Sequence, residues 1–352
     1  MARRRQAVTI KHVAADAGVS LQTVSRVING EPNVRPAMKE RVQASIEKLG
    51  YVPSIAARRM SGSRSYLILA LNDRERTIAD WQARQGTDWV DQMLLGGMLK
   101  CAEFGYRMII ELVDTHSDHV ERELNAALIA LEPDGIILTP PHSENPLITG
   151  LLKKRGVPFA RIGVRDSSPG LTLEMDDEGA ARLATQHLID LGHRRIGFIK
   201  GAPEYQLSAR REQGWRDAME QAGLPADGLS AAGDFSYESG LAAATELLAR
   251  SPQTTAILAS NDQMAIATLD AAAERGIAVP FDLSIVSFDN TPIAMFSQPP
   301  LTAVDQPIAA TVSRAVELLI AANRGEELPT ETEVIEARLI ERGSTALAPD
   351  GD

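Results

Sequence analysis

The stretch AGVSLQTVSRVINGEP, residues 17–32, decides how the N-terminal part of this chain is interpreted. Apolar residues recur in it at helical spacing, but the positions between them carry Gln22, Thr23, Ser25 and Arg26. A surface helix built only for stability would favour Glu, Lys and Ala at those positions, because short hydroxyl and amide side chains compete with the backbone for hydrogen bonds. The pattern therefore indicates a helix whose exposed face binds something.

A second helix precedes this one. Thr9 stands where an N-cap is expected, and apolar residues at helical spacing follow it as far as Ala17, where Gly18 breaks the pattern. Ser20 can cap the next helix. Two short helices joined by about three residues that include a glycine predict a helix-turn-helix, and a third helix over about residues 36–48 would close its core.

The charge of the chain is divided unevenly along its length. The first 64 of its 352 residues hold 12 Lys and Arg against 4 Asp and Glu, a net charge of +8, although the whole chain carries −11. A basic head on an acidic body is typical of a nucleic-acid-binding module joined to a larger soluble domain. An ordinary solvated run of charge is the alternative.

The start of the second helix has the residue types that read DNA in the major groove. Leu21 can contact a thymine methyl group, Gln22 can pair with adenine, and Arg26 can pair with guanine. Short polar side chains nearby suit phosphate contacts, which position the helix: Thr9, Ser20, Thr23, Ser25 and Asn29. The alternative is that all of these residues form a polar helix face without a ligand.

The segment YVPSIAARRMSGSRS, residues 51–65, predicts a very short helix between Pro53 and Gly62. Because helices below about 12 residues are marginal in water, it should stay coil until something supports it. Its residue types suit a minor groove, where small, cationic and apolar wedge side chains are used: Ala57, Arg58 and Met60. The alternative is a flexible linker with incidental arginines.

These motifs carry a resemblance. TIKHVAADAGVSLQTVSRVING and GYVPSIAARRM closely resemble the headpiece and hinge of the lac repressor family of bacterial transcription regulators, and HLIDLGHRRIGFIKG, SNDQMAIATLDAAAERG and PPLTAVDQP extend the resemblance through nearly the whole chain. It implies that Leu21, Gln22 and Arg26 read base edges and that Ala57 and Met60 enter the central minor groove. Most members have leucine at the position of Met60, and methionine keeps the wedge apolar but less rigid.

From residue 66 onward, apolar runs typical of buried strands alternate with amphipathic stretches. The expected strands are YLILALN, RMIIELV, GIILT, RRIGFIK, AILAS and SIVSF, and the expected helices cover about 90–105, 119–131, 178–191, 209–222, 237–250, 262–275 and 307–323. Repeated βα units favour parallel sheets covered by helices. Because there are too many strands for one comfortable sheet, we expect two lobes.

The resemblance implies an all-α headpiece and hinge helix joined to an α/β, two-lobed domain like the periplasmic binding proteins, with a ligand cleft between the lobes. The expected boundaries are 1–50 for the helix-turn-helix headpiece, 51–63 for the hinge, 64–346 for the effector-binding and dimerisation domain, and 347–352 for a tail. Lobe 1 is expected over about 64–163 and 306–328, and lobe 2 over about 164–305 and 329–346.

Individual cleft residues follow from the same resemblance: Arg211, Phe235, Asn261, Asp289 and Gln306. Their chemistry fits a sugar, because a carboxylate can accept from two adjacent hydroxyls while an aromatic ring covers the apolar face. The alternative is that Asp289 and Arg211 form a structural ion pair. A long, charged segment with Trp81 and Trp89 departs from the family pattern, and these tryptophans either stack on a carbohydrate or pack the lobe surface.

Other function classes have little support. The chain has no phosphate-binding glycine loop, no HExxH motif and a single cysteine, so no catalytic residue, metal or cofactor is expected. The possible cluster of His187, Asp190 and His193 lies in a pattern typical of a surface helix. No export signal and no long apolar segment is evident, which indicates a cytoplasmic protein without a membrane partner.

The expected mechanism is therefore a homodimeric repressor on a palindromic double-stranded operator, controlled by a small-molecule effector that is most simply a sugar. A corepressor-dependent regulator that senses a nucleobase or a partner protein remains the alternative. A dimer is expected rather than a tetramer because the segment ERGSTALAPDGD lacks apolar heptads.

Overall fold

The computed structural model describes residues 8–28, 33–51, 64–84, 88–115, 119–166, 168–251 and 253–349. The chain divides into two compact units, Met1–Tyr66 and Leu67–Asp352. Four residues with expected DNA contacts lie outside the described ranges: Asn29, Ala57, Arg58 and Met60. Within the described part of the chain, no helix combines the length and the apolar character that a membrane crossing requires.

The first unit is a three-helix bundle made of α1 (Ile10–Ala17), α2 (Leu21–Ile28) and α3 (Pro36–Leu49). Gly18 ends α1 with φ +61°, a left-handed conformation that suits glycine, and this sets the turn between the two short helices. The Ser20 hydroxyl accepts a hydrogen bond from the Thr23 backbone N–H (3.1 Å) and caps α2. A small core closes the bundle: Val13, Ala14, Ala17, Val24, Val27, Val42 and Tyr51.

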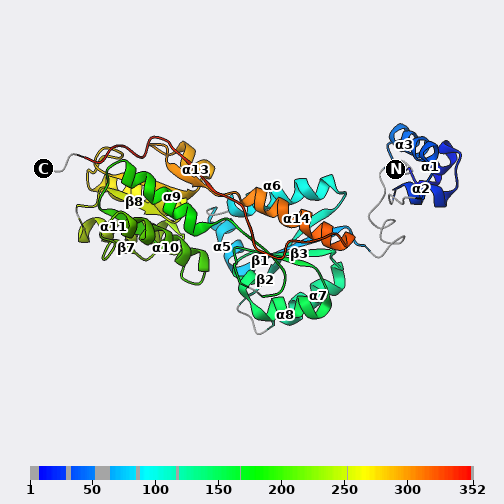
Figure 1. Cartoon of the computed structure of the whole chain (residues 1–352), viewed down its shortest axis with the longest axis horizontal. Coiled ribbons are helices and arrows are strands. Elements are labelled where there is room, and N and C mark those ends of the chain that lie inside the picture. The colour runs from blue at the N-terminus through cyan, green and yellow to red at the C-terminus, as the bar shows by residue number, and fades with distance from the viewer. Residues whose placement is uncertain are drawn as a thin grey trace, which may run out of the picture. The chain divides into compact units, whose positions relative to one another are not determined.

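The second unit contains two six-stranded sheets (Figure 1). The order in the first sheet is β11 (Glu333–Val334), β5 (Leu171–Glu174), β4 (Phe159–Ile162), β3 (Gly135–Leu138), β1 (Leu67–Asp73) and β2 (Arg107–Val113). All of its strand pairs are parallel. Its lobe also contains α5 (Arg74–Ala83), α6 (Asp88–Glu103), α7 (Val120–Leu131), α8 (Pro146–Arg155), α14 (Ile308–Arg324) and a short 3-10 helix (His142–Glu144).

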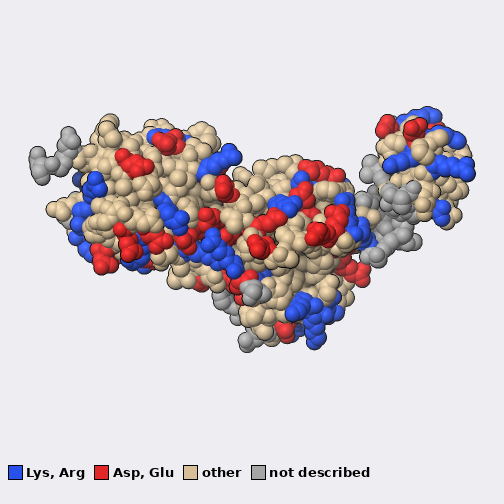
Figure 2. Space-filling view, viewed as in Figure 1, with Lys and Arg blue, Asp and Glu red and all other residues tan. Residues whose placement is uncertain are grey.

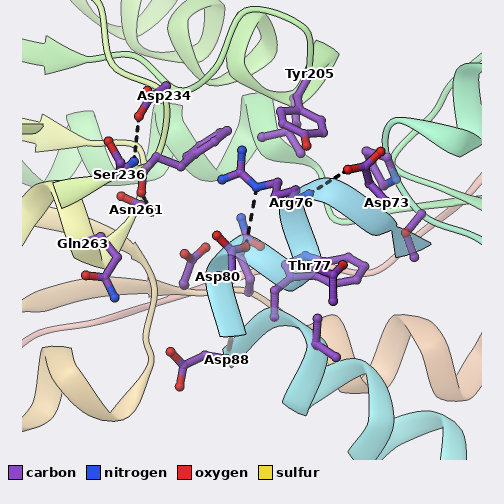
Figure 3. Close-up of a pocket in the computed structure, with 18 of the residues that line it drawn as sticks. Asp73, Arg76, Thr77, Asp80, Asp88, Tyr205, Asp234, Ser236, Asn261 and Gln263 are labelled. Atoms are coloured by element: carbon purple, nitrogen blue, oxygen red, sulfur yellow. Dashed lines mark hydrogen bonds and ion pairs between the residues drawn. The ribbon is translucent and has the colours of Figure 1, made fainter. Parts of the chain in front are cut away.

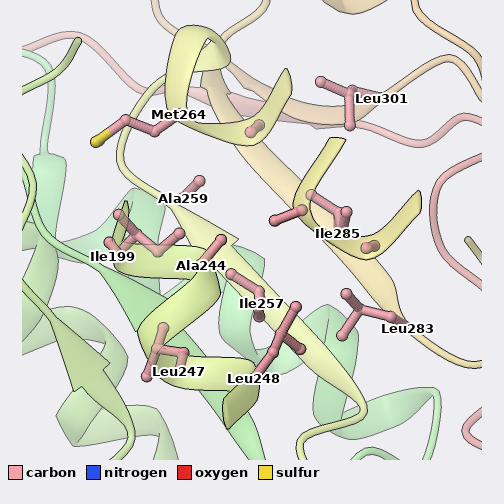
Figure 4. Close-up of a cluster of buried hydrophobic side chains, with 14 of the residues drawn as sticks. Ile199, Ala244, Leu247, Leu248, Ile257, Ala259, Met264, Leu283, Ile285 and Leu301 are labelled. Atoms are coloured by element: carbon pink, nitrogen blue, oxygen red, sulfur yellow. The ribbon is translucent and has the colours of Figure 1, made fainter. Parts of the chain in front are cut away.

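The order in the second sheet is β12 (Arg338–Ile340), β10 (Thr302–Asp305), β9 (Ser284–Asp289), β8 (Ala256–Ala259), β6 (Ile196–Ile199) and β7 (Ser230–Ala231), with only β12 antiparallel. The helices of this lobe are α9 (Asp177–Asp190), α10 (Gln206–Gln221), α11 (Tyr237–Arg250), α12 (Asp262–Glu274) and α13 (Pro292–Phe296). Buried side chains of α11, α12 and the strands form one of its two cores (Figure 4). This arrangement of parallel sheets under helices confirms the expected fold class.

The expected lobe boundaries at residues 163 and 328 are wrong. Strand β5 follows the first of these positions and β11 follows the second, yet both pair within the first sheet. The chain therefore passes to the second lobe only after each of these strands. Both are short and partly exposed, so they lack the continuous apolar run by which strands such as β1 and β3 were identified. The interior strands β4 and β10 were not among the expected strands either.

Helices α6 and α14 approach so closely that a side chain would not fit at Gly96, where a Cβ atom would lie 1.9 Å from the Ala309 carbonyl oxygen. We expect Gly96→Ala to lower the free energy of unfolding by about 1–3 kcal/mol or more, because the clash is with backbone. Gly150, inside α8, has no atom within 4 Å of the corresponding position. Gly150→Ala should instead stabilise the protein by about 0.5–1 kcal/mol. Urea unfolding of both variants tests this pair, and equal effects would contradict it.

Candidate functional site

The candidate site is a pocket of about 560 Å³ whose walls come from both lobes of the second unit. Residues at or just after the ends of β1, β3, β8, β9 and β10 line it. Ligands of open α/β sheets bind outside the carboxyl ends of the strands, so this position is the one that the topology favours. Arg211, Phe235, Asn261, Asp289 and Gln306, the five residues expected in the cleft, all line the pocket.

Arg211 is held by the protein itself. Its guanidinium Nε and Nη2 both lie 2.9 Å from Asp177 Oδ1, and both side chains are buried. The group also donates to the Ser260 carbonyl oxygen and lies over the Phe288 ring, 4.3 Å from its centroid. Arg211 is therefore paired with Asp177, and the alternative of an Arg211–Asp289 ion pair is wrong.

Asp289 and Gln306 bring polar groups that the protein does not satisfy. Among the described residues, no hydrogen bond to the Asp289 carboxyl group is present, and burial raises the pKa of this group to about 7 against the opposing effect of Arg211. The Gln306 side chain is only 7% exposed, and its Nε2 atom has no hydrogen-bond partner among the described residues. Because unsatisfied buried groups are costly, an acceptor and a donor here favour a polar ligand.

Asn261 and Phe235 have structural roles as well. Asn261 caps α12, with its Oδ1 accepting from the Met264 N–H (2.9 Å), while its Nδ2 donates to the Phe235 carbonyl oxygen (2.8 Å). Phe235 has φ +75°, a left-handed conformation that is rare for a bulky residue. Its ring lies 6.0 Å from that of Tyr205, centroid to centroid. The asparagine thus fixes the backbone that presents the aromatic ring to the pocket.

The first lobe contributes a wall that the sequence did not predict as a helix. Asp73 ends β1, and its Oδ1 accepts from the Arg76 N–H (2.9 Å), so that α5 begins there. Arg76 lies over the Tyr205 ring of the second lobe, 5.4 Å from its centroid (Figure 3). It also lies over the Phe235 ring, 5.6 Å from that centroid. The cap at Asp73 was the one signal in the sequence for this helix.

The two tryptophans of this region differ in their position relative to the pocket. Trp89 lines the pocket, whereas Trp81 does not and is 46% exposed on α5. Thr139 and Pro140, which follow β3, also line the pocket. Stacking on a ligand is therefore open to Trp89 only.

The histidine cluster lies elsewhere. His193 is buried among core hydroxyls, with Nδ1 2.9 Å from Thr255 Oγ1 and Nε2 3.0 Å from Ser284 Oγ. His187 contacts Thr345, and neither histidine lines the pocket. In the described ranges, no group of three or more His, Cys, Asp or Glu side chains is placed to hold a metal ion.

A second candidate interface lies on the first unit. Leu21 and Gln22 are exposed at the start of α2, and Arg26 is exposed near its end. Leucine at 44% exposure is unusual next to a small apolar core, and contact with a partner would explain it. Blue basic side chains lie across this unit in Figure 2, as the sequence indicated.

The raised pKa of Asp289 predicts a pH dependence. The folded protein holds this proton more tightly than the unfolded chain, so the free energy of unfolding should fall as the pH rises from about 4 to about 7. In Asp289→Asn the free energy of unfolding should fall less over the same pH range. Melting temperatures measured across that range would detect the difference. Asp190→Asn, at the exposed end of α9, is the matched control. Equal slopes in the wild type and Asp289→Asn would contradict the assignment.

Comparison with known proteins identifies the family of both units. Residues 9–54 match the profile of bacterial regulatory proteins of the lacI family, and residues 185–345 match that of a periplasmic binding protein-like domain. The transcriptional regulator CelR of Thermobifida fusca is 34% identical over 97% of this chain and 99% of its own length. Catabolite control protein A of Priestia megaterium is 33% identical over 96% of this chain and 99% of its own.

Solved structures of similar proteins lead to the same family. The CelR–cellobiose complex superposes with a TM-score of 0.71 at 32% identity, covering 96% of this chain and 99% of that one. The lac repressor dimer bound to operator and the anti-inducer ONPF gives a TM-score of 0.74 at 25% identity, covering 97% and 100%. The chain therefore belongs to the lacI family, and it is a DNA-binding transcriptional regulator rather than an enzyme.

Proposed function

We propose that this regulator is a repressor whose affinity for its operator is set by a sugar bound in the pocket between the two lobes. The observation that carries the proposal is that one pocket holds two polar groups with no hydrogen-bond partner among the described residues, the half-buried Asp289 carboxyl and the buried Gln306 Nε2. A carboxylate can accept from two adjacent sugar hydroxyls, and the amide N–H can donate to a third. The bound cellobiose of CelR supports a carbohydrate as the ligand class.

The aromatic side chains fit the same ligand. Phe235 and Tyr205 line the pocket, and sugar rings have an apolar face that packs against aromatic groups. Neither Arg211 nor Asn261 is a freely moving side chain, since Asp177 and the Phe235 carbonyl hold them. Such preorganised groups can orient a ligand with little loss of side-chain entropy.

In this proposal α2 reads the operator. Leu21, Gln22 and Arg26 contact base edges in the major groove. The positioning role belongs to the short polar residues Thr9, Ser20, Thr23, Ser25 and Asn29, and the minor-groove role to Ala57, Arg58 and Met60. The cap that Ser20 forms with the Thr23 N–H also directs the N-terminal end of α2, so both hydroxyl residues can act through the geometry of the helix.

The proposed active species is a homodimer on a palindromic operator. Two helices of the second unit expose apolar side chains, which are Leu95, Met98 and Leu99 on α6 and Ile293, Met295 and Phe296 on α13. Contiguous exposed apolar groups of this kind mark protein–protein contacts. Light scattering on the purified protein should give the mass of a dimer, and a stable tetramer would contradict this assembly.

Arg26→Ala should weaken binding to the correct operator by about 1–3 kcal/mol and relax discrimination at one base pair, because a bidentate base contact is lost. Lys39→Ala removes the same charge from the exposed face of α3 and serves as the control. Fluorescence anisotropy with the operator and with single-base variants, at one fixed salt concentration, measures both effects. Equal losses on operator and random DNA would refute base reading by Arg26.

Asp289→Ala should remove the response to the effector while leaving operator binding intact. The test is operator binding by the purified protein across a panel of mono- and disaccharides, with thermal shift in parallel. The active sugar should raise the melting temperature and weaken operator binding in the wild type but not in the variant. Silence across the panel would overturn the sugar proposal in favour of a nucleobase corepressor or a partner protein. A normal response in the variant would exclude Asp289.

A further inference from the structure

The pocket has a second polar wall. It contains none of the five residues that the family resemblance placed in the cleft. It consists of Thr77 and Asp80 on α5 together with Asp88 and Trp89 at the start of α6. Figure 3 shows Arg76 and Asp80 projecting from α5 toward the side of the pocket that carries Asp234, Ser236 and Asn261. We call Thr77, Asp80, Asp88 and Trp89 together the α5 wall. It faces the second-lobe groups across one continuous cavity.

The carboxylates of the α5 wall are weakly compensated by the protein. The cation partner of Asp80 is Arg76, but the distance from Nε to Oδ2 is 3.7 Å, which is too long for a hydrogen bond. Burial raises the pKa of Asp80 and of Asp88 above their ordinary values. Carboxylates in this condition favour a ligand that brings hydroxyl donors. The buried Gln306 Nε2, which has no hydrogen-bond partner among the described residues, favours a ligand oxygen that accepts.

Charge around the pocket limits the kind of sugar. Nine carboxylates line it: Asp73, Asp80, Asp88, Asp177, Glu204, Asp234, Glu238, Asp262 and Asp289. The described lining has only two cationic side chains, Arg76 and Arg211, and both are engaged, one over the aromatic rings and one with Asp177. A phosphate group would therefore meet like charge with no free cation to pair with, which is strongly unfavourable.

Size and aromatic surface point to more than one sugar ring. A volume of about 560 Å³ lies well inside the range of about 300–1,000 Å³ that suits drug-sized ligands, a class to which a disaccharide belongs. Trp89 supplies an aromatic side chain from the first lobe, while Tyr205 and Phe235 supply theirs from the second. Each lobe thus contributes aromatic surface to the pocket, and Arg76, which lies over the Tyr205 and Phe235 rings, joins α5 to the second lobe.

We propose that the α5 wall is a second saccharide subsite, and that the effector is an unphosphorylated oligosaccharide of at least two rings that reaches from Asp289 to Asp80. This inference rests on the proposed function and specifies its ligand. One ring occupies the second-lobe subsite with Asp289 and Gln306. The next ring donates its hydroxyls to Asp80 and Asp88 and packs against Trp89.

Calorimetric titration of the full-length protein tests the inference with neutral hexoses and pentoses, their disaccharides, and the 6-phosphates of the hexoses and of the hexose disaccharides. The active disaccharide should bind at least about tenfold more tightly than its monosaccharide and than its phosphate. Asp80→Asn should weaken the disaccharide by about 10- to 100-fold, the range for hydrogen bonds to a charged group, and leave the monosaccharide nearly unchanged. Asp88→Asn should weaken the disaccharide by a similar factor.

Glu75→Gln is the matched control, because it removes the same charge from an exposed position of α5 outside the pocket. It should leave all affinities unchanged. Equal affinity for mono- and disaccharide, tighter binding of a phosphate, or equal losses for both sugar sizes in Asp80→Asn would overturn the inference and leave the proposed function standing. If no saccharide of any size binds, the proposed function itself fails.

Discussion

The buried ion pair between Arg211 and Asp177 sets the polar chemistry of the pocket. Breaking such a pair would leave a buried charge without compensation, so both side chains are fixed where α10 meets the start of α9. Because the guanidinium is already satisfied by Asp177 and the Ser260 carbonyl, it does not neutralise Asp289 by direct contact. Burial therefore raises the pKa of Asp289 despite the nearby Arg211 charge, and the carboxyl group has no hydrogen-bond partner among the described residues.

Other side chains around the pocket also act by positioning their neighbours. Asn261 and Asp73 each cap a helix, and by doing so they place groups that face the ligand: the Phe235 ring in one case and Arg76 in the other. Arg76 then connects the first lobe to the aromatic pair of the second. Since the pocket is shared by both lobes, a ligand that contacts both stabilises one arrangement of the lobes over others, which is what population-shift control of DNA binding requires.

The sequence predicted the parts of the fold that have strong patterns. Central strands such as 135–138 are continuous apolar runs, and helices such as 237–250 have a clear apolar face. Strands β5 and β11 were missed because two to four partly exposed residues carry no such pattern. Helix α5 was missed because it is polar on nearly all sides, and it forms through the Asp73 cap and its place against the pocket.

The sequence predicted individual residues of the candidate site, but not the partners that hold them. The resemblance placed Arg211, Asp289 and Gln306 in the pocket, but it gave no reason to pair Arg211 with Asp177, which is 34 positions away in the sequence. The partners of a buried charge depend on how helices are packed, and local sequence does not contain that information. The contribution of α5 to the pocket was likewise out of reach, since it required the helix to be known first.

The central claim is that the pocket and the DNA-binding surface are thermodynamically coupled, and reciprocity tests it most directly. If a saccharide changes operator affinity by some factor, the operator must change saccharide affinity by the same factor. Titrating the active saccharide into the protein with and without saturating operator measures the second factor. The account predicts two equal factors of at least about fivefold. Saccharide affinity that does not change when the operator is bound would contradict it.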